Sequence, residues 1–127
     1  MIDHITFGVS NFAQSIAFYD KAFAPLGVTR LVNIPASADN NVEVAAYGDS
    51  RPWFWIAAAD PTNGKLHIAL NVESRSKVDE FYSAAMLAGA KDNGSPGIRS
   101  HYHPNYYGAF VLDPDGHNIE VVCHLPG

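Results

Sequence analysis

Two histidines and one glutamate are candidate ligands for a metal ion or for a polar small molecule. His4, His67 and Glu120 each lie in a strand-like segment, on the face opposite its alternating apolar residues. Imidazole and carboxylate groups are ligands that divalent transition ions accept. Their neighbours on the same faces are mostly small or polar, for example Gly8 and Ala69, which leaves space for a ligand. We therefore expect the three side chains to converge around one point, although each alone would be an ordinary surface or hydrogen-bonded residue.

The segment that carries Glu120 shows how the two faces are assigned. Residues 113–116 read Asp-Pro-Asp-Gly, which is typical of the turn in a β-hairpin. In the strand after this turn, Ile119, Val121 and Cys123 share one face, and Glu120 lies on the other. The apolar face is expected to meet the core, with Cys123 as a small buried side chain. If the opposite face lines a cavity, the Glu120 carboxylate needs a partner there.

An internal repeat relates the two histidines. Residues 3–10 and 66–73 align at a spacing of 63 that pairs His4 with His67, and the same spacing later pairs Tyr19 with Tyr82. Such a duplication predicts two modules of the same architecture. The pattern is that of an α+β fold in which each module is β-α-β-β-β. The expected elements are a strand at 2–9, a helix at 11–24 and strands at 28–34, 42–48 and 53–58, then a strand at 65–72, a helix at 75–88 and strands at 89–93, 107–113 and 117–124.

Cap and turn residues set the limits of these elements. Ser10 or Asn11 is expected to cap the first helix, and Gly27 and Gly89 follow the two helices as stop signals. The loop at 60–64 is rich in turn residues and separates the modules, at about residues 1–60 and 65–127. A chain of 127 residues is long enough for one domain with a core, so we expect a single domain made of both modules.

A loop before the seventh strand contains a second group of polar side chains. Residues 99–107 include two histidines and three tyrosines. As a lid over a cavity, this loop would offer His103 or Tyr106 as an acid, a base or a substrate contact. His101 would point to the same side as His103 if the loop were extended, and Arg99 is a candidate partner for a substrate carboxylate. The alternative is an ordered loop with packed rings and solvated imidazoles.

Two tryptophans form a third candidate contact surface. In the fourth strand, Phe54 and Ile56 are expected on the face toward the helix, which places Trp53 and Trp55 on the cavity face. The indoles would form a wall for a flat or apolar substrate, or would simply pack. Trp55 is the best match in the first module to Glu120, so an aromatic side chain stands where the repeat would allow a second carboxylate.

Composition and charge exclude several classes of protein. The chain is 47% hydrophobic and 17% charged, which is typical of a globular protein, and it has one cysteine, which excludes an internal disulfide. A net charge of -5 gives no reason to expect nucleic acid or an anionic membrane as partner. No apolar run is long enough to span a bilayer. Strand-like sequence begins at Ile2, which leaves no room for a signal peptide, so we expect a cytoplasmic protein. His117 and His124 are expected to be peripheral.

The chain resembles the vicinal oxygen chelate superfamily, which includes glyoxalase I, extradiol dioxygenases, fosfomycin-resistance thiol transferases and bleomycin-binding proteins. The segments that carry the resemblance are DHITFGVSNFAQSIAFYDKAF, KLHIALNV with the following VDEFYSAAMLAGA, and FVLDPDGHNIEVV. The resemblance implies paired βαβββ modules, a glyoxalase-like fold, whose eight strands form an incomplete barrel around the site. It also implies homodimers, in some members with sites shared between subunits.

The resemblance further implies that His4, His67 and Glu120 fall on the metal-ligand positions of the metal-using members. Glyoxalase I-like members carry another glutamate on the fourth strand, where this chain has Trp55. Two histidines and one glutamate form instead the ligand set of dioxygenase-like and fosfomycin-resistance-like members. Such a set would hold Fe, Mn, Ni, Co or Zn.

Two functions follow from this resemblance. The first is a metal-dependent lyase, isomerase or dioxygenase that acts on a small molecule with two adjacent oxygens. The metal would then act as a Lewis acid on those oxygens. The second is a metal-free protein that binds and sequesters a small planar ligand between aromatic walls, as bleomycin-binding relatives do.

Overall fold

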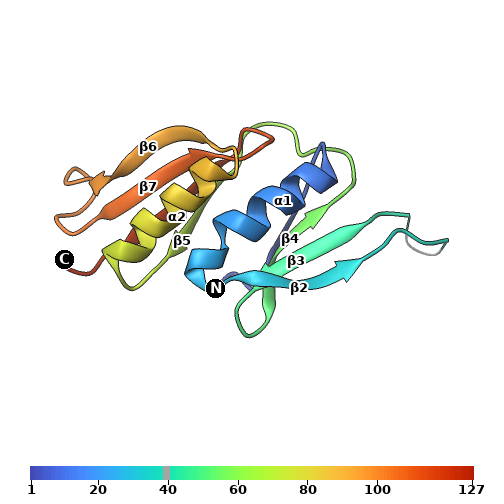
Figure 1. The fold of residues 1–127 in the computed structure, drawn as a ribbon, viewed down its shortest axis with the longest axis horizontal. Coiled ribbons are helices and arrows are strands. Elements are labelled where there is room, and N and C mark those ends of the chain that lie inside the picture. The colour runs from blue at the N-terminus through green and yellow to red at the C-terminus, as the bar shows by residue number, and fades with distance from the viewer. Residues whose placement is uncertain (39–40) are drawn as a thin grey trace.

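The computed structural model describes residues 1–38 and 41–127, which fold into two modules of the same design. The first contains β1 (Ile5–Gly8), α1 (Phe12–Ala22), a 3₁₀ turn η1 (Ala24–Leu26), β2 (Thr29–Ile34), β3 (Val44–Gly48) and β4 (Pro52–Ala57). The second contains β5 (His67–Asn71), α2 (Arg75–Leu87), β6 (Lys91–Ile98), β7 (Tyr107–Leu112) and β8 (Asn118–Cys123). Figure 1 shows the modules side by side, with α1 and α2 next to each other between the two sheets. The predicted α+β fold with paired βαβββ modules is confirmed.

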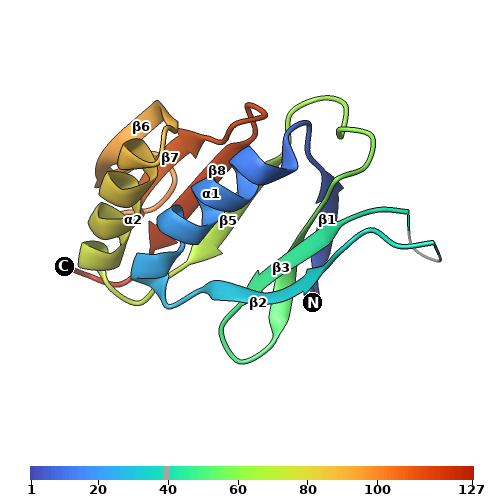
Figure 2. The same ribbon diagram turned by 45° about the vertical axis from the view of Figure 1, so that its right-hand side comes forward.

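Each module forms one four-stranded mixed sheet. The strand orders are β1-β4-β3-β2 and β5-β8-β7-β6, so the first strand of each module pairs in parallel with the last. Both sheets are open, and hydrogen bonds do not close the described strands of the chain into one barrel. Figure 2 shows α2 in front of the second sheet, and the strands of the first sheet to the right of α1. Among the strands that the structure describes, β1 and β5 therefore each have one edge without a strand partner.

The helices begin at residues whose side chains satisfy free backbone amides. Asn11 caps α1, with its Oδ1 accepting from Gln14 N at 3.1 Å, and Ser74 caps α2 by accepting from Lys77 N at 3.3 Å. Gly27 adopts φ 72° after η1, a left-handed conformation that favours glycine. The caps stand 63 residues apart, as the repeat requires.

The strands lie within one or two residues of their predicted limits except for β1 and β6, which differ more. β1 begins at Ile5, so His4 lies just before the strand rather than inside it. β6 was expected at 89–93 but spans Lys91–Ile98, because two register shifts, before and after Gly94, let it continue past Gly94, Pro96 and Gly97. A proline is tolerated there because β6 is the edge strand of its sheet.

One core runs through both modules and confirms the predicted helix faces. Phe54 and Ile56 of β4 are fully buried, as are Ile119 and Val121 of β8, and Cys123 is 1% exposed. Rings from α1, β3 and β4 pack edge-on or tilted in the first module. Among the described residues, no helix is long and apolar enough to cross a lipid bilayer.

Candidate metal centre

His67 and Glu120 meet on the face of the second sheet that points away from the helices. β5 and β8 are parallel neighbours with Ala69 opposite Glu120 and His67 opposite Asn118, so His67 and Glu120 sit on adjacent strands and on the same face. His67 Nε2 lies 2.7 Å from Glu120 Oε1. Two ligand atoms at right angles around an ion, each at about 2.1 Å, are separated by about 3.0 Å. The pair is therefore already close to the separation that a shared metal ion requires.

Glu120 is buried although it faces away from the core. Its exposed fraction is 1%, whereas the His67 side chain is 55% exposed. Tyr106 donates a short hydrogen bond to Glu120 Oε2, which leaves Oε1 for His67. Gly108 makes room for this contact, because a Cβ at that position would lie 3.3 Å from Tyr106 Cε1 and 3.6 Å from Glu120 Oε2. The carboxylate has the partner that its burial demands.

Tyr106 keeps its proton next to this carboxylate. Burial, and after it the hydrogen bond and charge of Glu120, raise the pKa of Tyr106 above its ordinary value. The phenol therefore donates at neutral pH and remains a donor into the alkaline range. This state suits a role as hydrogen-bond donor or acid better than a role as base.

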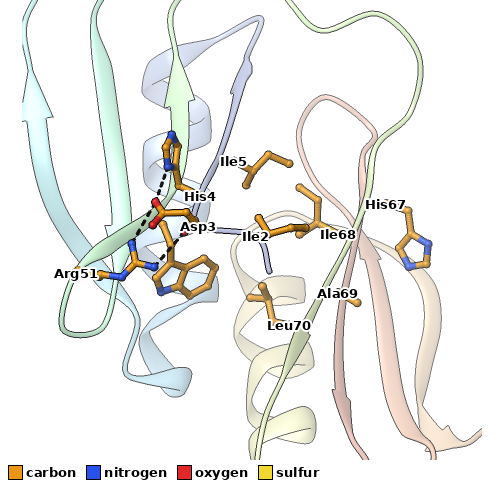
Figure 3. Close-up of a pocket in the computed structure, with 10 residues that line it drawn as sticks. Ile2, Asp3, His4, Ile5, Arg51, His67, Ile68, Ala69 and Leu70 are labelled. Atoms are coloured by element: carbon orange, nitrogen blue, oxygen red, sulfur yellow. Dashed lines mark hydrogen bonds and ion pairs between the residues drawn. The ribbon is translucent and has the colours of Figure 1, made fainter.

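His4 does not join the other two candidate ligands within the chain. Its side chain is 55% exposed, and its Nδ1 lies 2.7 Å from Asp3 Oδ1. Figure 3 shows His4 beside Asp3 and Arg51, while His67 lies across β5 and points away from them. In residues 1–38 and 41–127, no three His, Cys, Asp or Glu side chains come together as a metal site. The expected convergence is thus absent from the single chain, because His4 belongs to the first sheet and the other two residues to the second.

A small cluster of charges surrounds Asp3. Arg51, just before β4, approaches Asp3 Oδ1 with Nη1 at 3.4 Å and the Asp3 main-chain oxygen with Nη2 at 3.3 Å. The His4 hydrogen bond, and then the Arg51 charge, hold the pKa of Asp3 below its ordinary value. Asp3 was not among the site residues predicted from the sequence, although its position next to His4 was the available signal.

The strand register confirms the match between Trp55 and Glu120. Thr6 of β1 stands opposite Trp55, and Ala69, 63 residues after Thr6, stands opposite Glu120. The first module thus carries an indole where the second carries its carboxylate. Both tryptophans are half-buried.

A cavity of about 400 Å³ lies between the two modules. Trp53 lines it together with Ile68 and Leu70 of β5 and with the Asp3, His4 and Arg51 cluster. The Trp53 ring packs edge-on against Phe54, with ring centres 6.2 Å apart, so Trp53 serves both as packing and as a cavity wall. Trp55 does not line this cavity.

The loop before β7 lies over the second sheet and is turned rather than extended. The amides of Tyr102 and His103 both donate to the Arg99 carbonyl, at 2.9 and 3.3 Å. His101 therefore lines an opening of about 440 Å³ together with His67 and Arg99, whereas the His103 ring lies beside His124. His101 and His103 were expected on one side only if the loop were extended, and the turn means that this condition is not met.

Arg99 is anchored in this second opening. It donates to the carbonyls of Gly97 and Ser95, both at 2.8 Å, and its guanidinium lies over the Phe110 ring at 5.3 Å. Phe110 stands opposite Glu120 in the sheet and contacts the His67 ring. Phe110 was not among the residues predicted from the sequence, although period-two alternation in β7 would have placed it on this face.

A protein family and a characterised relative match the sequence of this chain. The sequence matches the Glyoxalase/Bleomycin resistance protein/Dioxygenase superfamily over residues 1–121. It is 28% identical to the metallothiol transferase FosB of Shouchella clausii, over 94% of this chain and 77% of that protein.

Solved structures show the same architecture. A glyoxalase/bleomycin resistance protein from Albidiferax ferrireducens has 25% identity and a TM-score of 0.72, covering 99% of both chains. The fosfomycin resistance protein FosX from Listeria monocytogenes was solved as a mutant with Mn(II) and 1S,2S-dihydroxypropylphosphonic acid. It has 18% identity and a TM-score of 0.71, over 96% of this chain and 90% of that one. The resemblance found in the sequence is confirmed: the chain belongs to the Glyoxalase/Bleomycin resistance protein/Dioxygenase superfamily.

Proposed function

We propose that this protein is a metal-dependent enzyme, a lyase, isomerase or dioxygenase, that acts on a small molecule with two adjacent oxygens. The observation that carries the proposal is the 2.7 Å approach of His67 Nε2 to the buried Glu120 Oε1. One imidazole nitrogen and one carboxylate oxygen fit the donor preferences of Fe, Mn, Ni, Co and Zn. Burying a carboxylate is costly, and the contacts of Glu120 with His67 and Tyr106 offset part of that cost.

We propose that His4 of a second copy supplies the third ligand in a homodimer. His4 is half exposed on the first sheet, and the His67–Glu120 pair faces outward on the second, so each module offers half of a site. β1 and β5 each have a free edge, and Met1 and Ile2 expose most of their apolar surface beside β1. A twofold dimer would bring the first module of one copy to the second module of the other, and would complete two equal sites.

A bound divalent ion would act there as a Lewis acid toward the two substrate oxygens. The other contacts with the substrate would come from side chains of the loop between β6 and β7, beside the second sheet. Tyr106 keeps its proton next to Glu120 and would contact the substrate as a hydrogen-bond donor. Arg99 and His101 line the adjacent opening and would bind an anionic or polar group of the substrate. His103, whose Nδ1 accepts from Asn105 N at 3.0 Å, stays a predicted acid or base on the rim of the loop.

Metal analysis of protein purified without chelator tests the proposal. We expect about one equivalent of Fe, Mn, Ni, Co or Zn per chain, lost in His67→Ala and in His4→Ala. His101→Ala removes an imidazole near the site that is not a proposed ligand, and it should retain the metal. Equal metal content in His67→Ala and the unaltered protein would refute the proposal.

Co-expression of His4→Ala and His67→Ala chains tests whether the sites are shared. In a mixed dimer, the His4→Ala copy still offers His67 and Glu120, and its partner still offers His4. One complete site should form, so the mixed dimer should bind about half the metal of the unaltered dimer. No recovery above the separate variants would show that the ligands do not combine across copies.

The second candidate is a metal-free binding protein. The cavity of about 400 Å³ with Trp53, Ile68 and Leu70 is the observation that favours it, because it is largely apolar and large enough for a small planar molecule. Quenching of tryptophan fluorescence by planar aromatic compounds in metal-free protein would support this function. The quenching should be absent in Trp53→Leu. A cytoplasmic location is a prediction in both cases.

A further inference from the structure

The Asp3 carboxylate contacts Nδ1 of His4, which is the ring nitrogen that the proposed metal would not bind. His4 Nδ1 lies 2.7 Å from Asp3 Oδ1, and Arg51 contacts the same oxygen and the Asp3 main chain. Figure 3 shows Asp3 between His4 and the Arg51 guanidinium. An ionised carboxylate accepts hydrogen bonds and cannot donate them. The contact therefore requires a proton on Nδ1, which in the neutral ring leaves the Nε2 lone pair free.

We propose that Asp3 is a positioning residue that fixes the tautomer of His4 and presents its Nε2 for ligation, while Arg51 holds Asp3 in place. The reading of Nε2 as a metal ligand rests on the proposed function, whereas the tautomer is a property of the metal-free chain. Carboxylate partners of this kind orient the imidazole and raise its basicity toward a metal. Arg51 comes from just before β4, so the arrangement is set by the fold and not only by the neighbouring residue.

The internal repeat offers a comparison within the chain. Leu66 stands at the position equivalent to Asp3, so His67 has no carboxylate before it. His67 instead meets Glu120 through Nε2. The two histidines that the repeat makes equivalent thus differ in what orients them, and replacing Asp3 should affect His4 alone.

Long-range ¹H–¹⁵N spectra of the imidazole rings in metal-free protein test the tautomer directly. At a pH of about 8, well above the ordinary histidine pKa, the His4 signals should show a protonated Nδ1. In Asp3→Ala they should move toward the form with a protonated Nε2, which free histidine prefers. Asp60→Ala removes the same charge at an exposed position and should leave the His4 spectrum unchanged. A protonated Nε2 on His4 of the unaltered protein, or no change in Asp3→Ala, would overturn the proposal.

Titration with Co(II), followed by its visible absorption, tests the consequence for ligation. Asp3→Ala should weaken Co(II) binding by about 10- to 100-fold, Asp3→Glu should recover part of the loss, and Asp60→Ala should bind as the unaltered protein does. Equal Co(II) affinity for Asp3→Ala and the unaltered protein would refute the positioning role. If the unaltered protein binds no Co(II), the proposed metal site fails, and the NMR result alone then decides whether Asp3 fixes the tautomer.

Discussion

The hydrogen bond between Tyr19 and Asp113 joins the two modules, and removing it should destabilise the protein substantially. Tyr19 OH donates to Asp113 Oδ2 at 2.5 Å, with Tyr19 fully buried and Asp113 5% exposed. Asp113 Oδ1 accepts from the amides of Asp115 and His117, at 3.0 and 2.8 Å, just before β8 begins. The bond therefore ties α1 of the first module to the turn that leads into the strand of Glu120.

The structure allows the size of the effect to be estimated for Tyr19→Phe. A hydrogen bond to a charged group contributes about 1.5–3 kcal/mol, and the upper half of this range applies where the acceptor is buried. The two amides still donate to Oδ1, so the Asp113 carboxylate keeps part of its hydrogen bonding. We expect a loss of about 2–3 kcal/mol in the free energy of unfolding. For a chain of this length, that corresponds to a fall in Tm of about 8–12 °C.

Tyr82→Phe provides a matched control because the repeat makes Tyr82 equivalent to Tyr19. Tyr82 OH also donates to an aspartate, Asp92 Oδ1 at 3.0 Å, but at the surface. Urea denaturation followed by circular dichroism should show a lower midpoint and an unchanged slope for Tyr19→Phe, and almost no change for Tyr82→Phe. If both variants lose the same free energy of unfolding, burial does not explain the contribution of the Tyr19 hydrogen bond to stability. In an Asp113→Ala background, Tyr19→Phe should cost much less, since its partner is already gone.

Two further predictions concern stability. Gly8→Ala should cost at least about 2 kcal/mol in urea denaturation, because its Cβ would fall 2.1 Å from the Asp60 carbonyl oxygen. Gly97→Ala would meet only the end of the Arg99 side chain, at 3.3 Å, and should cost less. Burial raises the pKa of Tyr19, Tyr47 and Tyr106 in the folded chain, so between about pH 10 and their folded pKa values the unfolded state binds fewer protons than the folded state. The stability that these tyrosines contribute should therefore be fully present below about pH 10 and be lost as the pH rises further. Tyrosinate absorbance should appear at a higher pH in folded than in urea-unfolded protein. Titrations that coincide in the two states would contradict this.

The sequence by itself determined which faces of β4 and β8 meet the core. Ile56 and Ile119 are buried, while Trp55 and Glu120 lie on the opposite faces, as period-two alternation predicts. This holds because a residue's face depends only on its own place in its strand. The repeat at a spacing of 63 likewise predicted the equivalence of Trp55 and Glu120, because duplicated modules pair their strands in the same register.

Only the tertiary structure decided which of these side chains meet. His67 reaches Glu120 because β5 pairs with β8, whereas His4 belongs to the other sheet and pairs with Asp3. His117 was expected to be peripheral but is buried at 1% exposure, where its Nδ1 accepts from Leu66 N. Such contacts depend on strand order, loop turns and the packing of the helices, which join residues far apart in the chain, and local residue patterns carry no information on them.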